Sequence, residues 1–100
     1  FSMSTSFDGS VFVVELFGEL DALRAPEVEA VMRRAEGSPA DLILVDLSAL
    51  HFIDFSGIQV LMNAAKRSQA GGRMRFLRGV GQVERVLKIC GLEIYFEFLD

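Results

Sequence analysis

The chain has 100 residues, enough for one domain with a hydrophobic core and too few for two. Apolar residues make up 51% of it, which excludes the composition of a disordered chain. The formal net charge of −4 at pH 7 argues against a nucleic-acid-binding surface, because binding phosphates requires a basic patch.

Cysteine and histidine each occur once, as Cys90 and His51. This excludes an internal disulfide and a metal site built on a histidine pair, and we expect no cofactor. No apolar stretch approaches the length of a membrane span, and no signal peptide precedes the first predicted strand. We therefore expect a cytoplasmic protein without a membrane span.

Two strands are predicted near the N-terminus, from Met3 to Phe7 and from Val11 to Phe17. Asp8-Gly9 between them tolerates the positive φ angles of a tight hairpin. Gly18-Glu-Leu-Asp21 is then predicted to turn the chain away from the sheet. Phe1-Ser2, which precede Met3, are interpreted as a cloning remnant, which gives a single domain over residues 3–100.

The next segment is predicted to be an amphipathic helix. Pro26 suits the first helical position. Apolar residues follow at the spacing of one helix face: Val28, Val31, Met32 and Ala35. Gly37 is expected to end this helix as a left-handed cap.

An unbroken apolar run from Leu42 to Val45 predicts a strand buried on both faces of a sheet. A short polar turn is expected after it. Asp54 then stands where a helix should be capped, since its carboxylate can accept hydrogen bonds from the free N–H groups of Ser56 or Gly57. Gly71-Gly72 is expected to end this helix. Its predicted core face consists of Ile58, Leu61, Met62 and Ala65.

Three further elements complete the prediction. Residues 73–78 alternate as a half-buried strand, with a solvated face formed by Arg73, Arg75 and Arg78. A helix from Gln82 to Cys90 is predicted to bury Cys90 as an inert thiol and to stop at Gly91. Ile94 to Phe98 is predicted as a last short strand. The order β-β-α-β-α-β-α-β predicts an α/β sandwich, a mixed β-sheet of about five strands with helices packed over it.

Catalysis and nucleotide binding find little support in the residues. Ser56 follows a strand and opens a helix, but a nucleophile elbow requires glycine at the position of Asp54. His51 is the one candidate base, and closeness in sequence does not create a nucleophile–base geometry. Asp46 and Asp54 are explained as a strand-end acid and a helix cap. Gly79-Val-Gly81 lacks the lysine of phosphate-binding loops. We therefore do not expect an enzyme.

Two short motifs together resemble those of a known family. Asp54-Phe-Ser-Gly-Ile58, read with Gly18-Glu-Leu-Asp21, resembles the STAS domain family of bacterial anti-sigma factor antagonists. The resemblance covers nearly the whole chain, from about Met3 to the last predicted strand. It implies a STAS-like fold and a role in transcription regulation. The domain would bind an anti-sigma factor, a protein with an ATPase-like serine kinase fold, and would thereby free a sigma factor.

The resemblance also implies a partner-binding surface around the second motif. This surface would consist of Asp21, Asp54, Phe55, Ser56, Gly57, Gln59 and Met62. In the family, the partner kinase phosphorylates the hydroxyl residue directly after the Asp, and the added charge breaks the contact. Here Phe55 occupies that position, so phosphorylation control does not carry over with the motif. Ser56, one position later, is the remaining candidate for phosphorylation.

Phe55 leaves two interpretations open. Its ring could fold down and cover the helix end, or it could stand exposed as an aromatic anchor for a partner. The inward face is already filled by Ile58, Leu61 and Ala65, which favours the anchor. The function has an alternative as well: a STAS domain of another system, such as an anion transporter tail, a stress-sensing assembly or a lipid-transport accessory protein.

Overall fold

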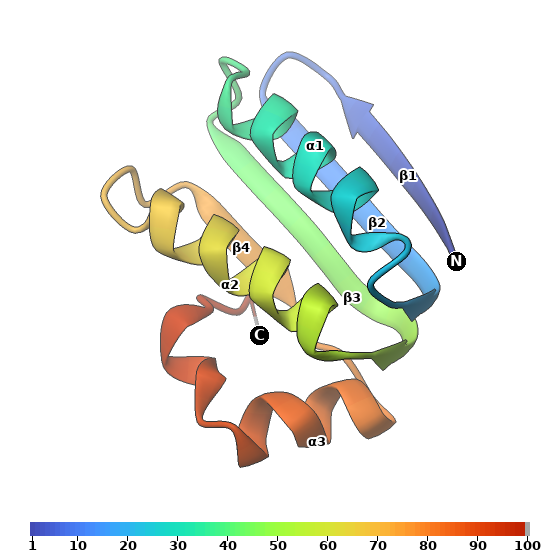
Figure 1. Cartoon of the computed structure of the whole chain (residues 1–100). Helices are drawn as coiled ribbons and strands as arrows, with labels where there is room; N and C mark the ends of the chain where they lie inside the picture. The colour runs from blue at the N-terminus through green and yellow to red at the C-terminus, as the bar shows by residue number, and fades with distance from the viewer. Residues whose placement is uncertain (100) are drawn as a thin grey trace.

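Four strands form one mixed sheet, whose spatial order β1-β2-β3-β4 follows the chain. The computed structural model describes residues 1–99, so Asp100, the last residue of the predicted domain, lies outside the described part. β1 runs antiparallel to β2, whereas β2, β3 and β4 are parallel to one another (Figure 1). The strands span, in order, Ser2–Phe7, Val11–Leu20, Leu42–Ile53 and Met74–Leu77.

The β1–β2 hairpin forms at Asp8-Gly9, which confirms the prediction. Gly9 takes a φ of 94°, which a residue with a Cβ rarely adopts. The Asp8 carboxylate accepts hydrogen bonds from the backbone N–H groups of Val11 at 2.7 Å and Ser10 at 2.8 Å. These donors hold the pKa of Asp8 below its ordinary value, because they stabilise the charged carboxylate.

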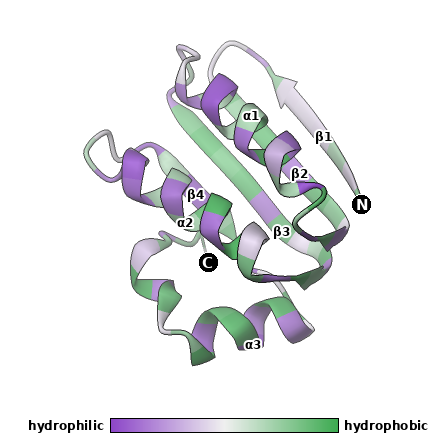
Figure 2. Cartoon of the chain, in the orientation of Figure 1, coloured by the Kyte–Doolittle hydropathy of each residue, from purple (hydrophilic) through white to green (hydrophobic). Residues whose placement is uncertain are grey.

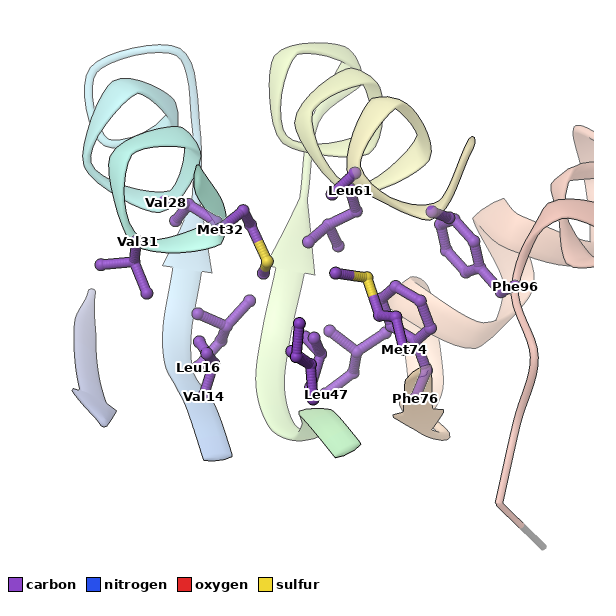
Figure 3. Close-up of a cluster of buried hydrophobic side chains, with 14 of the residues drawn as sticks. Val14, Leu16, Val28, Val31, Met32, Leu47, Leu61, Met74, Phe76 and Phe96 are labelled. Atoms are coloured by element: carbon purple, nitrogen blue, oxygen red, sulfur yellow. The ribbon is translucent and has the colours of Figure 1, made fainter. Parts of the chain in front are cut away.

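Two helices, α1 (Ala25–Glu36) and α2 (Phe55–Ser68), cover one face of the sheet. Figure 3 shows apolar side chains of both helices pointing towards the strands and filling the layer between them. The predicted face of α1 is fully buried: Val28, Val31, Met32 and Ala35. On α2, Met62 is half-buried, and the buried members of the predicted face are Ile58, Leu61 and Ala65. Figure 2 shows β3, the strand beneath the two helices, as mostly apolar with a short hydrophilic band along it.

A third helix, α3 (Gly81–Ile89), packs beside β3 and buries Val83 and Leu87. Cys90 follows it and is exposed, so the predicted burial of this thiol is wrong. Gly91 takes the left-handed conformation with a φ of 67° where the helix stops, as predicted. Gly37 ends α1 with a φ of −81°, so the left-handed cap expected there is wrong.

The central strands differ from the prediction in both burial and length. Along β3, Ile43 and Val45 are buried, but Leu42 and Leu44 are only half-buried. The prediction of burial on both faces is therefore wrong, because α1 and α2 lie on the same face of the sheet (Figure 3).

Two predicted turns are also strand. Gly18–Leu20 continues β2, and residues 48–53 continue β3, where Gly18 pairs with Leu50 and Leu20 with Ile53. The register shifts between Glu15 and Phe17 and again between Gly18 and Glu19. Pairing across the sheet thus overrides the local preference for a turn.

The C-terminal segment does not form the strand predicted from Ile94 to Phe98. Leu92–Tyr95 is a short 3₁₀ helix, η1, and Phe98 makes one isolated bridge to Phe76. Phe96 is buried and stacks on Phe76, with ring centroids 4.6 Å apart. The described sheet therefore has four strands instead of about five, and the predicted mixed α/β class is confirmed.

Arg73 contacts the end of α1 instead of lying on a solvated face. Its guanidinium donates to the carbonyl oxygens of Ser38 at 2.9 Å and Ala40 at 2.6 Å, and also to that of Glu36. Carbonyl groups in the last turn of a helix lack intrahelical N–H donors. Arg73 supplies one such donor and ties the start of β4 to the α1–β3 connection.

The other two arginines of the predicted face form ion pairs. Arg75 lies 3.2 Å from a carboxylate oxygen of Glu97, and Arg78 lies 3.3 Å from one of Glu93. Arg78 is exposed and Arg75 is half-buried, so these two positions keep the solvent access that was predicted, with their charges paired to the C-terminal segment.

Replacing Arg73 by alanine is expected to lower the free energy of unfolding by about 1–3 kcal/mol, because half-buried carbonyl groups lose their charged donor. Arg33→Ala is the matched control, since Arg33 forms an exposed i,i+4 pair with Glu29 at 3.0 Å, a kind of pair worth about 0.3–0.5 kcal/mol. Urea denaturation measures both variants. Equal midpoints for the two would contradict this role of Arg73.

Candidate functional site

Asp54 joins two loops at the start of α2. Its Oδ1 accepts from the N–H of Gly57 at 3.0 Å, which confirms the predicted helix cap. Its Oδ2 accepts from the N–H of Ala22 at 3.2 Å, and its own N–H donates to the carbonyl of Leu20 at 3.1 Å. One carboxylate oxygen therefore orders the helix start, and the other holds the loop after β2 against it.

Asp21 orders the same loop from within. Its Oδ1 accepts from the N–H groups of Leu23 at 3.1 Å and Arg24 at 3.2 Å. The carboxylate is exposed but hydrogen-bonded to the backbone, so it is more than a solvated charge. Because the adjacent Ala22 contacts Asp54, the structure places the two sequence motifs side by side.

Gly57 lets α2 begin close to the ends of two strands. A Cβ added there would lie 2.8 Å from Cγ1 of Ile53 and 2.8 Å from Cγ of Leu20, closer than side-chain atoms pack. A larger residue would push the first turn of α2 away from β2 and β3. The glycine therefore has a packing role here, beside the partner-binding role that the resemblance implies.

Gln82 fixes the end of β3 from the other side. Its side-chain amide donates to the carbonyl of Ile53 and accepts from the N–H of Ile53, both at 3.0 Å. The amide thus pairs with the strand end as a neighbouring strand would, and holds the β4–α3 loop against it. The sequence gives no signal for this contact, because a glutamine in the first turn of a helix ordinarily faces solvent.

Three segments meet at this end of the sheet: the β2–α1 loop, the β3–α2 junction and the β4–α3 loop (Figure 1, lower right). Each of them carries large apolar side chains that are exposed. The side chains are Leu23, Phe52, Phe55 and Val80, with exposed fractions of 82%, 40%, 72% and 56%. We call them the apolar rim. Large apolar side chains on three adjoining segments mark an interaction surface more clearly than one isolated residue does.

The apolar rim was only partly predictable. Phe55 was a candidate, and the structure leaves its ring exposed instead of folded over the helix end. Leu23, Phe52 and Val80 were not predicted, because an apolar residue in a presumed loop or strand gives no sign of its exposure. The remaining candidates lie nearby on α2: Ser56 is half-buried, Gln59 is exposed and Met62 is half-buried against the core.

Across residues 1–99, no three His, Cys, Asp or Glu side chains are grouped so that they could hold a metal ion. Within the same residues, no helix has both the length and the apolar character needed to cross a membrane.

A comparison with protein families decides the membership of this chain. The model of the STAS domain matches residues 2–99. The chain belongs to the STAS domain family. A search of curated protein sequences gives no match.

Several solved structures resemble this STAS domain. An anti-sigma factor antagonist from Mycobacterium paratuberculosis is 26% identical with a TM-score of 0.77, over 97% of this chain and 85% of that one. The anti-sigma factor antagonist SpoIIAA in its unphosphorylated form is 22% identical with a TM-score of 0.79, over 99% and 89%. The phosphorylated form of SpoIIAA, a Bacillus cell fate determinant, is 22% identical with a TM-score of 0.73, over 99% and 92%.

Asp54→Ala is expected to lower the free energy of unfolding of the STAS domain by about 0.5–2 kcal/mol, because the N–H of Gly57 loses its acceptor. Asp54→Asn should cost less, since its one carbonyl oxygen can still cap the helix. Urea denaturation compares the variants. An unchanged midpoint for Asp54→Ala would show that the cap contributes nothing to stability.

Proposed function

We propose that this STAS domain is an anti-sigma factor antagonist. It binds an anti-sigma factor, a protein with an ATPase-like kinase fold, through the surface around Asp54–Ile58 and so frees a sigma factor. The observation that carries the proposal is the apolar rim, which surrounds the two motifs that Asp54 holds together. The family match and the 26% identity to an anti-sigma factor antagonist support it.

The apolar rim has the properties of a binding surface. Phe55 and Leu23 present large side chains on backbone that hydrogen bonds already order, so binding costs little further conformational entropy. Aromatic residues at the centre of an interface supply much of its binding energy. Gln59 and Met62 extend this surface along α2.

The charges around the apolar rim select the partner. Glu19 and Asp21 are exposed at the end of β2 and in the loop that carries Leu23, Glu27 in the first turn of α1 is paired with Arg24 at 2.7 Å, and the whole chain has a net charge of −4. A partner with an apolar recess bordered by basic residues would complement this arrangement and approach it faster at low salt.

Docking on this surface does not depend on phosphorylation. Phe55 is the first residue of α2 and has no hydroxyl. Ser56 lies about 100° further round the helix and is half-buried. A kinase directed at the first position of the helix therefore meets an aromatic ring. We propose an antagonist that binds its partner constitutively.

Phe55→Ala and Leu23→Ala are each expected to weaken partner binding at least about tenfold, or about 1.4 kcal/mol. Ile89→Ala is the matched control, since Ile89 is also 82% exposed but lies at the far end of α3. The partner is first captured from lysate on wild-type protein and identified by mass spectrometry, then purified and titrated by calorimetry.

An ATPase-like anti-sigma factor that loses affinity for the rim variants but not for the control would support the proposal. Membrane transport components in its place would favour a STAS domain of another system. Equal affinity of all variants for an anti-sigma factor would move the interface away from the apolar rim.

Wild-type protein incubated with its anti-sigma factor and ATP is expected to gain little or no phosphate, because in-line transfer requires a hydroxyl at the first helical position. Phe55→Ser should restore modification, with weaker docking because the ring is lost. Intact-mass measurement reads the outcome, and Ser56→Ala is the control. Stoichiometric phosphate on wild type that disappears in Ser56→Ala would establish Ser56 as the acceptor and contradict constitutive binding.

A further inference from the structure

The outer edge of β1 is an unprotected strand edge. β1 is the first strand of the sheet, and within residues 1–99 β2 is the one strand that pairs with it. Its residues, Ser2–Phe7, include no charged residue, proline or glycine, and its register with β2 runs without a bulge. Proteins ordinarily protect such edges with charges, proline, bulges or a covering segment, because free N–H and C=O groups can pair with another chain.

The opposite edge of the same sheet is protected. The N–H of Phe76 in β4 donates to the carbonyl of Glu97 at 2.8 Å, and the N–H of Leu99 donates to the carbonyl of Phe76 at 2.9 Å. The C-terminal segment thus pairs with β4. The outer side of β1 faces open space on the right of Figure 1.

The hairpin determines which groups of β1 point outward. Hydrogen-bonded and non-hydrogen-bonded pairs alternate along an antiparallel ladder. The N–H of Asp8 donates to the carbonyl of Val11, so the alternation starts from that pair. The main-chain groups of Ser2, Ser4 and Ser6 therefore face β2, and the outward-facing groups are those of Met3, Thr5 and Phe7.

We propose that β1 pairs antiparallel with β1 of a second copy of this chain, centred on Thr5. This register places Thr5 opposite Thr5 of the second copy, and Met3 opposite Phe7. It uses all the outward main-chain groups of both strands, since each such pair exchanges two hydrogen bonds. The two sheets become one continuous sheet across a two-fold axis.

The side chains favour a second copy as the occupant. Phe7 is 43% exposed and Met3 is half-buried, and both project to the side of β1 that carries Thr5. In the proposed register each Phe7 ring meets the thioether of Met3, a favourable contact that covers the ring. The other side of β1 brings Ser4 opposite Ser6. β1 itself carries no charged residue, so the two strands bring no like charges together; Arg34 of each copy, which donates to Thr5 at 3.3 Å, is the charged group that comes nearest to the axis.

In the proposed dimer Thr5 lies at the two-fold axis and meets Thr5 of the second copy. A charged residue introduced at this position would therefore face the same charge, which provides a test. Thr5→Lys or Thr5→Glu alone places like charges opposite each other and is expected to raise the dimer Kd at least about tenfold. An equimolar mixture of the two variants places opposite charges there and is expected to restore dimers, as heterodimers. Thr5→Val is the matched control and should dimerise like wild type, although it loses the hydroxyl that Arg34 contacts at 3.3 Å.

Sedimentation equilibrium over a concentration series measures the association, and circular dichroism checks that each variant is folded. Dimers of wild type and of Thr5→Val, loss of dimers in each charged variant and their return in the mixture would support the proposal. Wild type that stays monomeric at all concentrations, charged variants that dimerise like wild type, or a mixture that stays monomeric would overturn it. Phe55→Ala should leave dimerisation unchanged, which separates this result from the test of the proposed function.

Discussion

The candidate site depends on one carboxylate. Asp54 accepts the N–H of Gly57 with one oxygen and the N–H of Ala22 with the other, and its own N–H binds Leu20. These contacts hold a helix start, a loop and a strand end in one arrangement. Without the second oxygen, the loop that carries Leu23 would lose its link to the segment that carries Phe55. The relative position of Leu23 and Phe55 in the apolar rim therefore depends on the two carboxylate oxygens of Asp54, one bound to the helix start and the other to the loop.

Close packing and a side-chain amide also hold the start of α2 and the end of β3 in place. Gly57 lets α2 approach the ends of β2 and β3 more closely than any side chain would permit, and Gln82 pairs with the main chain of Ile53. The buried side chains that fill the core come from other residues, and none of them belongs to the apolar rim (Figure 3). Phe55 and Leu23 are exposed and thus contribute little to the fold, which leaves both side chains accessible for the proposed partner contact.

Local patterns predicted the elements whose form depends on neighbours in sequence. The Asp8-Gly9 hairpin, the buried face of α1, the cap at Asp54 and the stop at Gly91 are all present. Sequence patterns failed where the conformation of a segment depends on contacts with residues far away in the chain. Residues 48–53 extend β3 because β2 lies alongside, and Ile94–Phe98 is no strand because Leu92–Tyr95 forms a 3₁₀ helix, which leaves one bridge between Phe98 and Phe76.

The sequence by itself determined the α/β class, the family motifs and the position of Asp54, because spacing and capping are encoded over a few residues. Only the tertiary structure decided that Arg73 binds the end of α1, that Cys90 is exposed, and that Leu23, Phe55 and Val80 are exposed on segments held together by Asp54 and Gln82. Each of these facts depends on segments that are far apart in the chain and meet when the sheet assembles. Whether a loop residue is exposed, and which group a side chain contacts, is decided only when these segments come together in the folded sheet.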